Sequence, residues 1–223
     1  SGALRWHRTL PFRFGHNMHL ADSDGDGCEE AMLGHCLVRG DGTVAWSVEE
    51  MRYEPLGAMG IHADSVVMGD LTGDGTVRLA SVAGDDGVLF VDGTSGKLLN
   101  RRRIGHAQGI TAARYVRAVP GLQVLAGTRH RAYGIFVLFD GWGQPLHRWQ
   151  PDLVNQNGTP VNWDGSGEEL LMLSSPDAGH GLFDWQGRLV VPFPEPLAAA
   201  GRIVAQPVGD DPRDRLLAVG RDA

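Results

Sequence analysis

Short apolar runs separated by turns rich in glycine and aspartate cover most of this chain. Three of these runs, "GVLFVDG" (87–93), "IFVLFDG" (135–141) and "GLFDWQG" (181–187), end in an acidic turn and are followed by another short run. Two short runs joined by a tight turn are typical of a β-hairpin. Only "EPLAAAG" (195–201) favours a helix, and it is short. The pattern predicts an all-β chain.

The hairpin signal recurs along the chain, together with a second signal upstream of it. Its copies begin at residues 41, 92, 140 and 184, at intervals of 51, 48 and 44 residues. The upstream signal is an acidic turn that enters an apolar strand. Its copies are "ADSDGDGCEEAMLG" (21–34), "GDLTGDGTVRLASVAG" (69–84) and "VNWDGSGEELLMLS" (161–174), with a shortened copy at 208–220 and one without acids at 114–127.

A repeat of this length with four short strands predicts a β-propeller of four-stranded antiparallel blades, one domain over residues 1–223. We expect blades over 13–60, 61–107, 108–157 and 158–203, and partial blade strands in 1–12 and 204–223. These four or five blades either close on a composite blade or belong to a propeller of about seven or eight blades. The alternatives are a β-sandwich, whose strands rarely keep so long a period, and a β-solenoid, whose coils are shorter.

Charge and composition narrow the range of partners. The formal net charge is -7, and no basic block exists beyond residues 101–103, so nucleic acid is not expected to bind. No apolar run approaches the ~20 residues of a membrane-spanning helix, so no membrane partner is expected. Cys28 and Cys36 are too far apart along one strand for a disulfide, and we expect both to be reduced. An incomplete propeller would leave open sheet edges that favour self-association.

The first acidic turn is a candidate calcium site. Asp22, Asp24 and Asp26 alternate within it, and a tight turn brings such side chains to one point, where hard oxygen ligands select Ca²⁺. Glu30 can close the shell. The EF-hand pattern fails, because the position of its closing glutamate is Leu33. The alternative is that these acids are present only because they favour turns.

The other two acidic turns carry weaker versions of the same pattern. In the second copy, Arg78 occupies the region of the closing acid. In the third copy, Asn162 and Asp164 are the predicted ligands, and Glu169 lies near the closing position. We expect a metal in any of these turns to hold the scaffold rather than to take part in chemistry, since it would replace core that a glycine-rich turn lacks.

Histidines recur at the starts of the predicted innermost strands, which face one another at the channel mouth of a propeller. This slot contains His16 and His19, then His62, then His106, then Asn155, with 46 residues from His16 to His62 and 44 from His62 to His106. Such a cluster can bind a transition metal or supply an imidazole base. The alternative is that each histidine caps a strand or bonds within a turn.

Four motifs resemble those of the rhamnogalacturonan lyase-like β-propellers, which belong to a wider group with calcium-binding FG-GAP-type blades. They are "HLADSDGDGCEEAMLG", "GIHADSVVMGDLTGDG", "NGTPVNWDGSGEELLMLS" and "GDDPRDRLLAVG", and they span residues 16 to 220. The resemblance implies a Ca²⁺-containing protein that acts on a polysaccharide or oligosaccharide and is secreted or periplasmic. Family lyases usually have more blades than this chain provides.

A lyase of this type must neutralise a uronate carboxylate, remove the acidic proton beside it and protonate the leaving oxygen. The resemblance therefore suggests a base (His62 or His106), an acid (Tyr133), carboxylate partners (Arg103, Arg129 and Arg131) and further substrate contacts (His16 and Asn155). Five tryptophans offer either sugar-stacking platforms or packing groups: Trp46, Trp142, Trp149, Trp163 and Trp185.

A non-catalytic FG-GAP-type propeller, stabilised by calcium and binding glycan or protein, is the main alternative function. A truncated, inactive relative of the lyases is another. The histidines distinguish these hypotheses. If they lie apart from one another or are buried in turns, the enzyme hypothesis loses its main support.

Overall fold

The computed structural model describes residues 4, 6–9, 15–48, 63–129, 134–150, 158–175, 179–195 and 202–219, and they form antiparallel β-sheets. Sheet 1 contains β1 (Met18–Ala21), β2 (Glu30–Leu33), β3 (Cys36–Val38) and β4 (Val44–Ser47). Sheet 2 contains β5 (Ser65–Gly69), β6 (Arg78–Val82), β7 (Val88–Asp92) and β8 (Leu98–Arg102). Sheet 3 contains β9 (Ala107–Ala113), β10 (Gln123–Thr128), β11 (Phe136–Phe139) and β12 (Pro145–Trp149).

Sheet 4 contains β13 (Thr159–Val161), β14 (Leu170–Ser175), β15 (Gly179–Phe183) and β16 (Leu189–Pro192). A two-stranded sheet of β17 (Arg202–Pro207) and β18 (Asp214–Val219) follows. Each four-stranded sheet pairs its strands in chain order, and each connection is an antiparallel hairpin or short loop. In the described part of the chain, no helix is long and apolar enough to cross a membrane.

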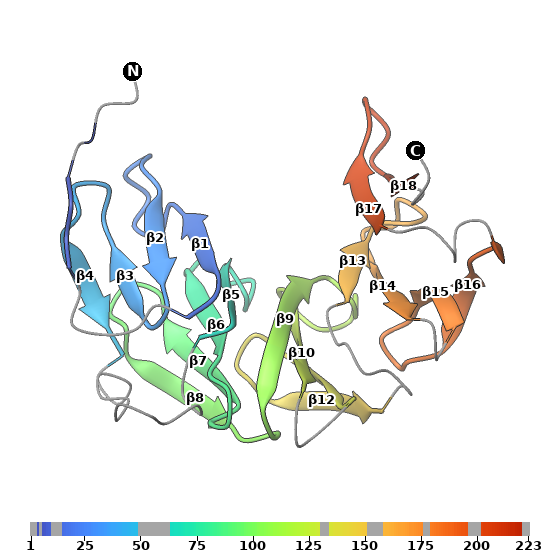
Figure 1. Ribbon diagram of the computed structural model, residues 1–223, viewed down its shortest axis with the longest axis horizontal. Coiled ribbons are helices and arrows are strands. Elements are labelled where there is room, and N and C mark those ends of the chain that lie inside the picture. Colours follow the sequence, from blue (N-terminus) through green and yellow to red (C-terminus); the bar gives the residue numbers. More distant parts are fainter. Residues whose placement is uncertain are drawn as a thin grey trace.

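The sheets follow one another around an arc, with sheet 1 and the β17–β18 hairpin at its two ends (Figure 1). The first strands of successive sheets are neighbours in space: β1 contacts β5, β5 contacts β9, β9 contacts β13, and β13 contacts β17. The fourth strands lie on the outside of the arc (Figure 1). The starts of the first strands therefore gather along the inner side of the arc.

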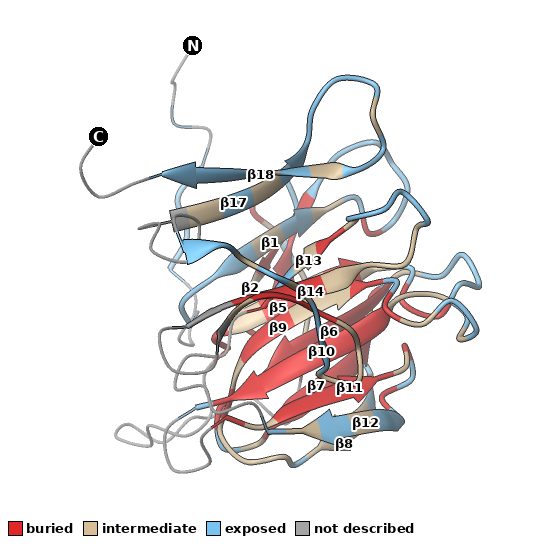
Figure 2. Ribbon diagram, turned by 90° about the vertical axis from the view of Figure 1, so that its right-hand side faces the viewer, coloured by how far each residue is buried: buried red, intermediate tan, exposed pale blue. Residues whose placement is uncertain are grey.

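The apolar cores lie between neighbouring sheets. One core joins β2 and β3 of sheet 1 to β5, β6 and β7, and the next joins sheet 2 to sheet 3. Because the middle strands are covered on both faces, β6 and β11 are buried along their whole length, while β12 and β16 on the outside are largely exposed (Figure 2).

Glycines in the hairpin between the third and fourth strands let adjacent sheets approach closely. Each adopts a positive φ and donates its N–H to a backbone carbonyl three positions earlier, or four positions earlier for Gly96. Each also lies against an aromatic side chain from an earlier part of the chain. The contacts are Gly42 with Trp6, Gly96 with Trp46, Gly143 with Phe90 and Gly187 with Trp149. A hydrogen bond from Trp46 Nε1 to Gly93 O, at 2.9 Å, reinforces one of them.

The predicted all-β class and the four-stranded antiparallel units are confirmed. Four separate sheets in chain order exclude a two-sheet sandwich and a solenoid of parallel coils. In the part of the chain that the structure describes, β17 and β18 pair only with each other, so no strand pairing closes the arc into a ring there.

Gly96→Ala is expected to destabilise the protein more than Gly209→Ala. Both glycines have a positive φ, +73° and +68°, which costs an alanine about 1–2 kcal/mol. A Cβ on Gly96 would also lie 2.5 Å from Trp46, whereas one on Gly209 meets no atom within 4 Å. The clash adds about 1–3 kcal/mol. Urea unfolding measures the difference, and equal losses would contradict the packing role of the glycine.

Candidate functional site

The first acidic turn joins β1 to β2 and wraps around the carboxylate of Asp22. Asp22 Oδ1 accepts the N–H of Gly25 at 2.7 Å, and its Oδ2 accepts the N–H of Gly27 at 3.0 Å. Both glycines have a positive φ, so the loop folds back over the carboxylate. Asp26 accepts the N–H of Cys28 at 2.7 Å, which tightens the end of the turn.

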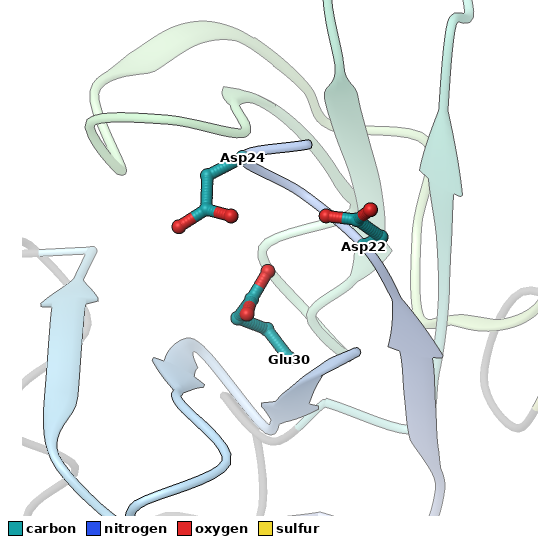
Figure 3. Close-up of side chains that lie close together, drawn as sticks. All are labelled: Asp22, Asp24 and Glu30. Carbon is teal, nitrogen blue, oxygen red and sulfur yellow. The ribbon is translucent and has the colours of Figure 1, made fainter. Parts of the chain in front are cut away.

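Glu30 brings a third carboxylate to the same turn from the start of β2. It is 2% exposed, and its Oε2 accepts the N–H and the hydroxyl of Ser23 at 2.8 and 2.6 Å. Carboxylate oxygens of Asp22, Asp24 and Glu30 all lie within 4.8 Å of one another and share one space (Figure 3). Three carboxylates so close repel one another, and a bound cation relieves that repulsion. The group can therefore hold a metal ion.

Strand register identifies the equivalent residues in the other two turns. Ala21 pairs with Glu30, and in the same way Gly69 pairs with Arg78 and Val161 with Leu170. The closing position is therefore an acid in the first turn, a base in the second and an apolar residue in the third.

In the third turn, the predicted ligands Asn162 and Asp164 bond within the protein. Asn162 Oδ1 accepts the N–H of Gly165 at 3.0 Å, and its Nδ2 donates to Pro212 O at 2.9 Å, which links sheet 4 to the β17–β18 hairpin. Asp164 accepts the N–H of Ser166 at 2.8 Å, and hydrogen bonds from Ser166 lower the pKa of Asp164. Among the described residues, Asp164 belongs to no group of three His, Cys, Asp or Glu side chains that could hold a metal ion. Their metal binding stays a prediction.

A second candidate site is a pocket of about 90 Å³ on the inner side of the arc. The starts of the first strands of all four sheets contribute to it, through Asn17, Ser65, Gln108 and Gly158. The wall toward sheet 3 adds Thr111 and apolar groups, among them Ile110, Leu125 and Phe136. Among the described residues, the lining carries amides and hydroxyls but no charged group. The Oε1 atom of Gln108 is buried and has no hydrogen-bond partner in the described structure.

The predicted histidine slot lies at this same end of the inner strands, but the pocket uses residues slightly further along. Asn17 follows His16 directly, Gln108 comes two residues after His106, and Gly158 comes three after Asn155. The pocket residues that the sequence did not predict are therefore uncharged. Their only signal in the sequence was the blade period itself.

His16 and His106 each lie next to an aspartate. His16 Nε2 is 3.5 Å from Oδ1 of the buried Asp64, and the histidine is 69% exposed. His106 Nδ1 is 2.7 Å from Asp85 Oδ1, and His106 is 11% exposed. In the described ranges, neither histidine is part of a group of three ligands suited to a metal. The predicted cluster also includes His62, which lies outside the described residues, so a shared metal site stays a prediction. A histidine oriented by an aspartate is a suitable general base.

Two of the predicted arginines lie close to His106, Arg103 along the chain and Arg129 in space. Arg103 Nη2 is 3.3 Å from Asp86 Oδ1, and its side chain is 71% exposed. Arg129 is exposed and donates its backbone N–H to His106 O at 2.8 Å. The other predicted site residues, His62, Arg131, Tyr133 and Asn155, lie outside the described residues.

The tryptophans divide between packing and exposure. Trp46 is 8% exposed, and Trp149 and Trp185 pack against the core between sheets 3 and 4. Trp142 and Trp163 are 49% and 41% exposed, and Trp142 stacks on a guanidinium of sheet 2. The packing interpretation therefore holds for Trp46, Trp149 and Trp185.

Solved rhamnogalacturonan lyases have a similar fold. Rhamnogalacturonan lyase YesW gives a TM-score of 0.64 at 22% identity, and the exotype rhamnogalacturonan lyase YesX gives 0.68 at 20%. Rhamnogalacturonan lyase PL11 of Bacillus licheniformis gives 0.64 at 20%. The matches cover 93%, 93% and 94% of this chain but only 36%, 37% and 34% of those chains.

The family resemblance of the acidic turns is thus confirmed at the level of fold, since identities this low carry the fold alone. The chain spans about a third of the length of the lyases that it matches. No family model matches the sequence, and no curated protein does.

Glu169→Gln is expected to stabilise the protein at neutral pH. Burial raises the pKa of Glu169, so its ionised form opposes folding, whereas glutamine carries no charge. A raised carboxyl pKa favours folding below the ordinary pKa of glutamate, and this contribution is lost as the pH rises through the folded-state pKa. The advantage of glutamine should therefore be absent in acid and grow toward neutral pH.

Urea unfolding at several pH values measures this trend, with Glu168→Gln in the same turn as the control. If Glu169→Gln instead lowers stability only when Ca²⁺ is present, Glu169 is a metal ligand and the expectation is wrong.

Proposed function

We propose that this chain forms part of a β-propeller of the lyase type, which binds a uronate-containing polysaccharide and cleaves it by β-elimination. The observation that carries the proposal is the inner mouth of the arc. There Gln108, which lines the neutral pocket, follows His106 by two residues, and the His106 ring lies 2.7 Å from Asp85. The similarity in fold to three rhamnogalacturonan lyases supports it. Such a substrate would be met outside the cytoplasm.

The elimination requires a base that removes the proton from the carbon beside the uronate carboxyl group. The freed electron pair forms a carbon–carbon double bond, and the bond to the leaving glycosidic oxygen breaks. When His106 donates Nδ1–H to Asp85, its Nε2 keeps a lone pair and serves as this base. Arg103 and Arg129 would pair with the carboxylate, because a guanidinium matches the two oxygens of a carboxylate. Tyr133 as the acid and His62 as the alternative base stay predictions.

The pocket suits a sugar unit without charge. Asn17, Ser65, Gln108 and Thr111 offer donors and acceptors for hydroxyl groups, and Phe136 offers an apolar face. The partnerless Oε1 of Gln108 would accept a hydrogen bond from a sugar hydroxyl, which removes the cost of burying it unpaired. A neutral sugar in this pocket would hold the neighbouring uronate unit near His106.

The non-catalytic alternative rests on the same pocket. The described part of its lining contains no acid, base or guanidinium, so it can bind glycan without chemistry. The two functions differ in whether His106 affects product formation.

We assign Ca²⁺ to the turn of Asp22, Asp24 and Glu30. Carboxylate oxygens are the ligands that Ca²⁺ prefers, and backbone carbonyls and water complete its shell. Asp26, whose Oδ1 accepts the N–H of Cys28, would act mainly by shaping the turn. The ion would fix the connection between β1 and β2 and take no part in the elimination.

His106→Ala is expected to lower kcat on a uronate polysaccharide by about 10²–10⁴-fold, because it removes the base. The absorbance of the unsaturated product measures the rate, and isothermal titration with an oligosaccharide of the same polymer measures binding. His7→Ala, at an exposed position, is the matched control. Gln108→Leu should weaken binding in either function.

A wild-type protein that binds the oligosaccharide without forming product would exclude the lyase and favour the binding propeller. Full activity of His106→Ala would remove His106 from the mechanism. Absence of both binding and product would contradict both functions.

Ca²⁺ is expected to raise the Tm of the wild-type protein, and Glu30→Gln to remove most of that rise. An ion bound only to the folded state stabilises it by about 2.7 kcal/mol at a free concentration of 100 Kd. Thermal unfolding in Ca²⁺ and in EDTA measures the effect, with Asp41→Asn, at an exposed position outside the three acidic turns, as the control. Equal calcium-dependent rises in wild type and Glu30→Gln would refute the assignment.

A further inference from the structure

The first two acidic turns share one backbone path and differ in the residue that closes them. Asp70 of the second turn accepts the N–H groups of Gly73 and Gly75 at 2.7 and 2.9 Å, just as Asp22 accepts those of Gly25 and Gly27 in the first turn. All four of these glycines have φ between +76° and +86°. The two turns are therefore the same structure with different side chains.

The side chain that closes the second turn is a buried guanidinium. Arg78 is 7% exposed and occupies the register position of Glu30. Its Nη1 and Nη2 atoms donate to the two carboxylate oxygens of Asp74 at 2.7 and 2.9 Å. Nη1 also donates to the hydroxyl of Thr72. Thr72 and Asp74 stand where the first turn has Asp24 and Asp26.

Charge follows the same division. The first turn has five carboxylates and no cationic side chain between residues 22 and 30. The second has two carboxylates and one guanidinium between residues 70 and 78, a net charge of minus one. The hydrogen bond from Arg78 holds the pKa of Asp74 well below its usual range, so this carboxylate stays ionised beside its partner.

The guanidinium also reaches the next sheet. Arg78 Cζ lies 4.2 Å from the ring centroid of Trp142, in the hairpin between β11 and β12. This distance is within the range of a cation–π contact. The same side chain thus closes its own turn and binds sheet 3.

We propose that Arg78 takes the place of a metal ion in the second acidic turn and fastens sheet 2 to sheet 3 through Trp142. The second turn is therefore independent of calcium, and any demand of the scaffold for metal falls on turns that keep a closing acid. This inference concerns the scaffold and stands apart from the carbohydrate site.

Arg78→Gln tests the structural part. It should lower Tm by roughly 2–8 °C, by the same amount in Ca²⁺ and in EDTA, because the lost cation belongs to the protein. It should also weaken the fall in stability below the ordinary pKa of aspartate, since the lowered pKa of Asp74 contributes stability above that pH and loses it in acid. An unchanged Tm, or a loss seen only in Ca²⁺, would overturn the proposal.

Thr72→Asp/Arg78→Glu tests the replacement itself, because it gives the second turn acids at the positions of Asp24 and Glu30. With Tb³⁺ as the probe, the double variant should bind one more ion per chain than the wild type. Its emission should be sensitised by Trp142 and lost when Trp142→Phe is added, while the count of bound ions stays the same. Wild-type Tb³⁺ binding that Asp70→Asn removes would show that the native second turn already holds metal and would refute the proposal. A double variant that folds, as judged by circular dichroism, yet binds no further ion would also refute it.

Discussion

Every four-stranded sheet of this protein has two apolar faces, and this constraint determines the rest of the structure. A sheet of four short strands cannot bury both faces by itself, so the cores lie between sheets rather than within them. Stacking succeeds only where backbones approach closely, at hairpin glycines such as Gly96, which lies directly against Trp46. The arc, and the meeting of the first strands on its inner side, follow from this stacking.

Tight turns at the end of each first strand are the weak points of such a scaffold, because they hold little apolar surface. The three acidic turns follow the same backbone path, but each is held by a different kind of contact. Carboxylates gather around Asp22 in the first turn, Arg78 supplies an internal cation in the second, and Asn162 ties the third turn to the β17–β18 hairpin. A repeated turn can therefore change its means of closure one residue at a time while its shape stays the same.

The same stacking of sheets brings together the residues at the inner mouth of the arc. Sheets 1, 2 and 4 each contribute one residue at the start of their first strand, and sheet 3 contributes the other seven, so the lining combines positions far apart in the sequence. Beside it, His106 is oriented by Asp85, which belongs to the preceding sheet's β6–β7 turn. A neutral pocket close to an oriented histidine would bring binding and proton transfer to one place, and this is the basis of the function proposed for the mouth.

The all-β class, the four-stranded repeat and the acidic turns could be predicted from the sequence, because local alternation, turn residues and a fixed period encode them directly. It also singled out Asp22, Asp24 and Glu30, whose spacing within one turn brings them together without help from distant residues. The residues that line the pocket at the inner mouth, by contrast, depend on how the sheets pack in the tertiary structure. The histidine period indicated the end of the inner strands where the pocket lies. The pocket is lined there by residues one to three positions further along the chain, Asn17, Ser65, Gln108 and Gly158. The partners of Arg78 and His106 were likewise invisible in the sequence, because the strand register and the packing of one sheet on the next set which side chains meet.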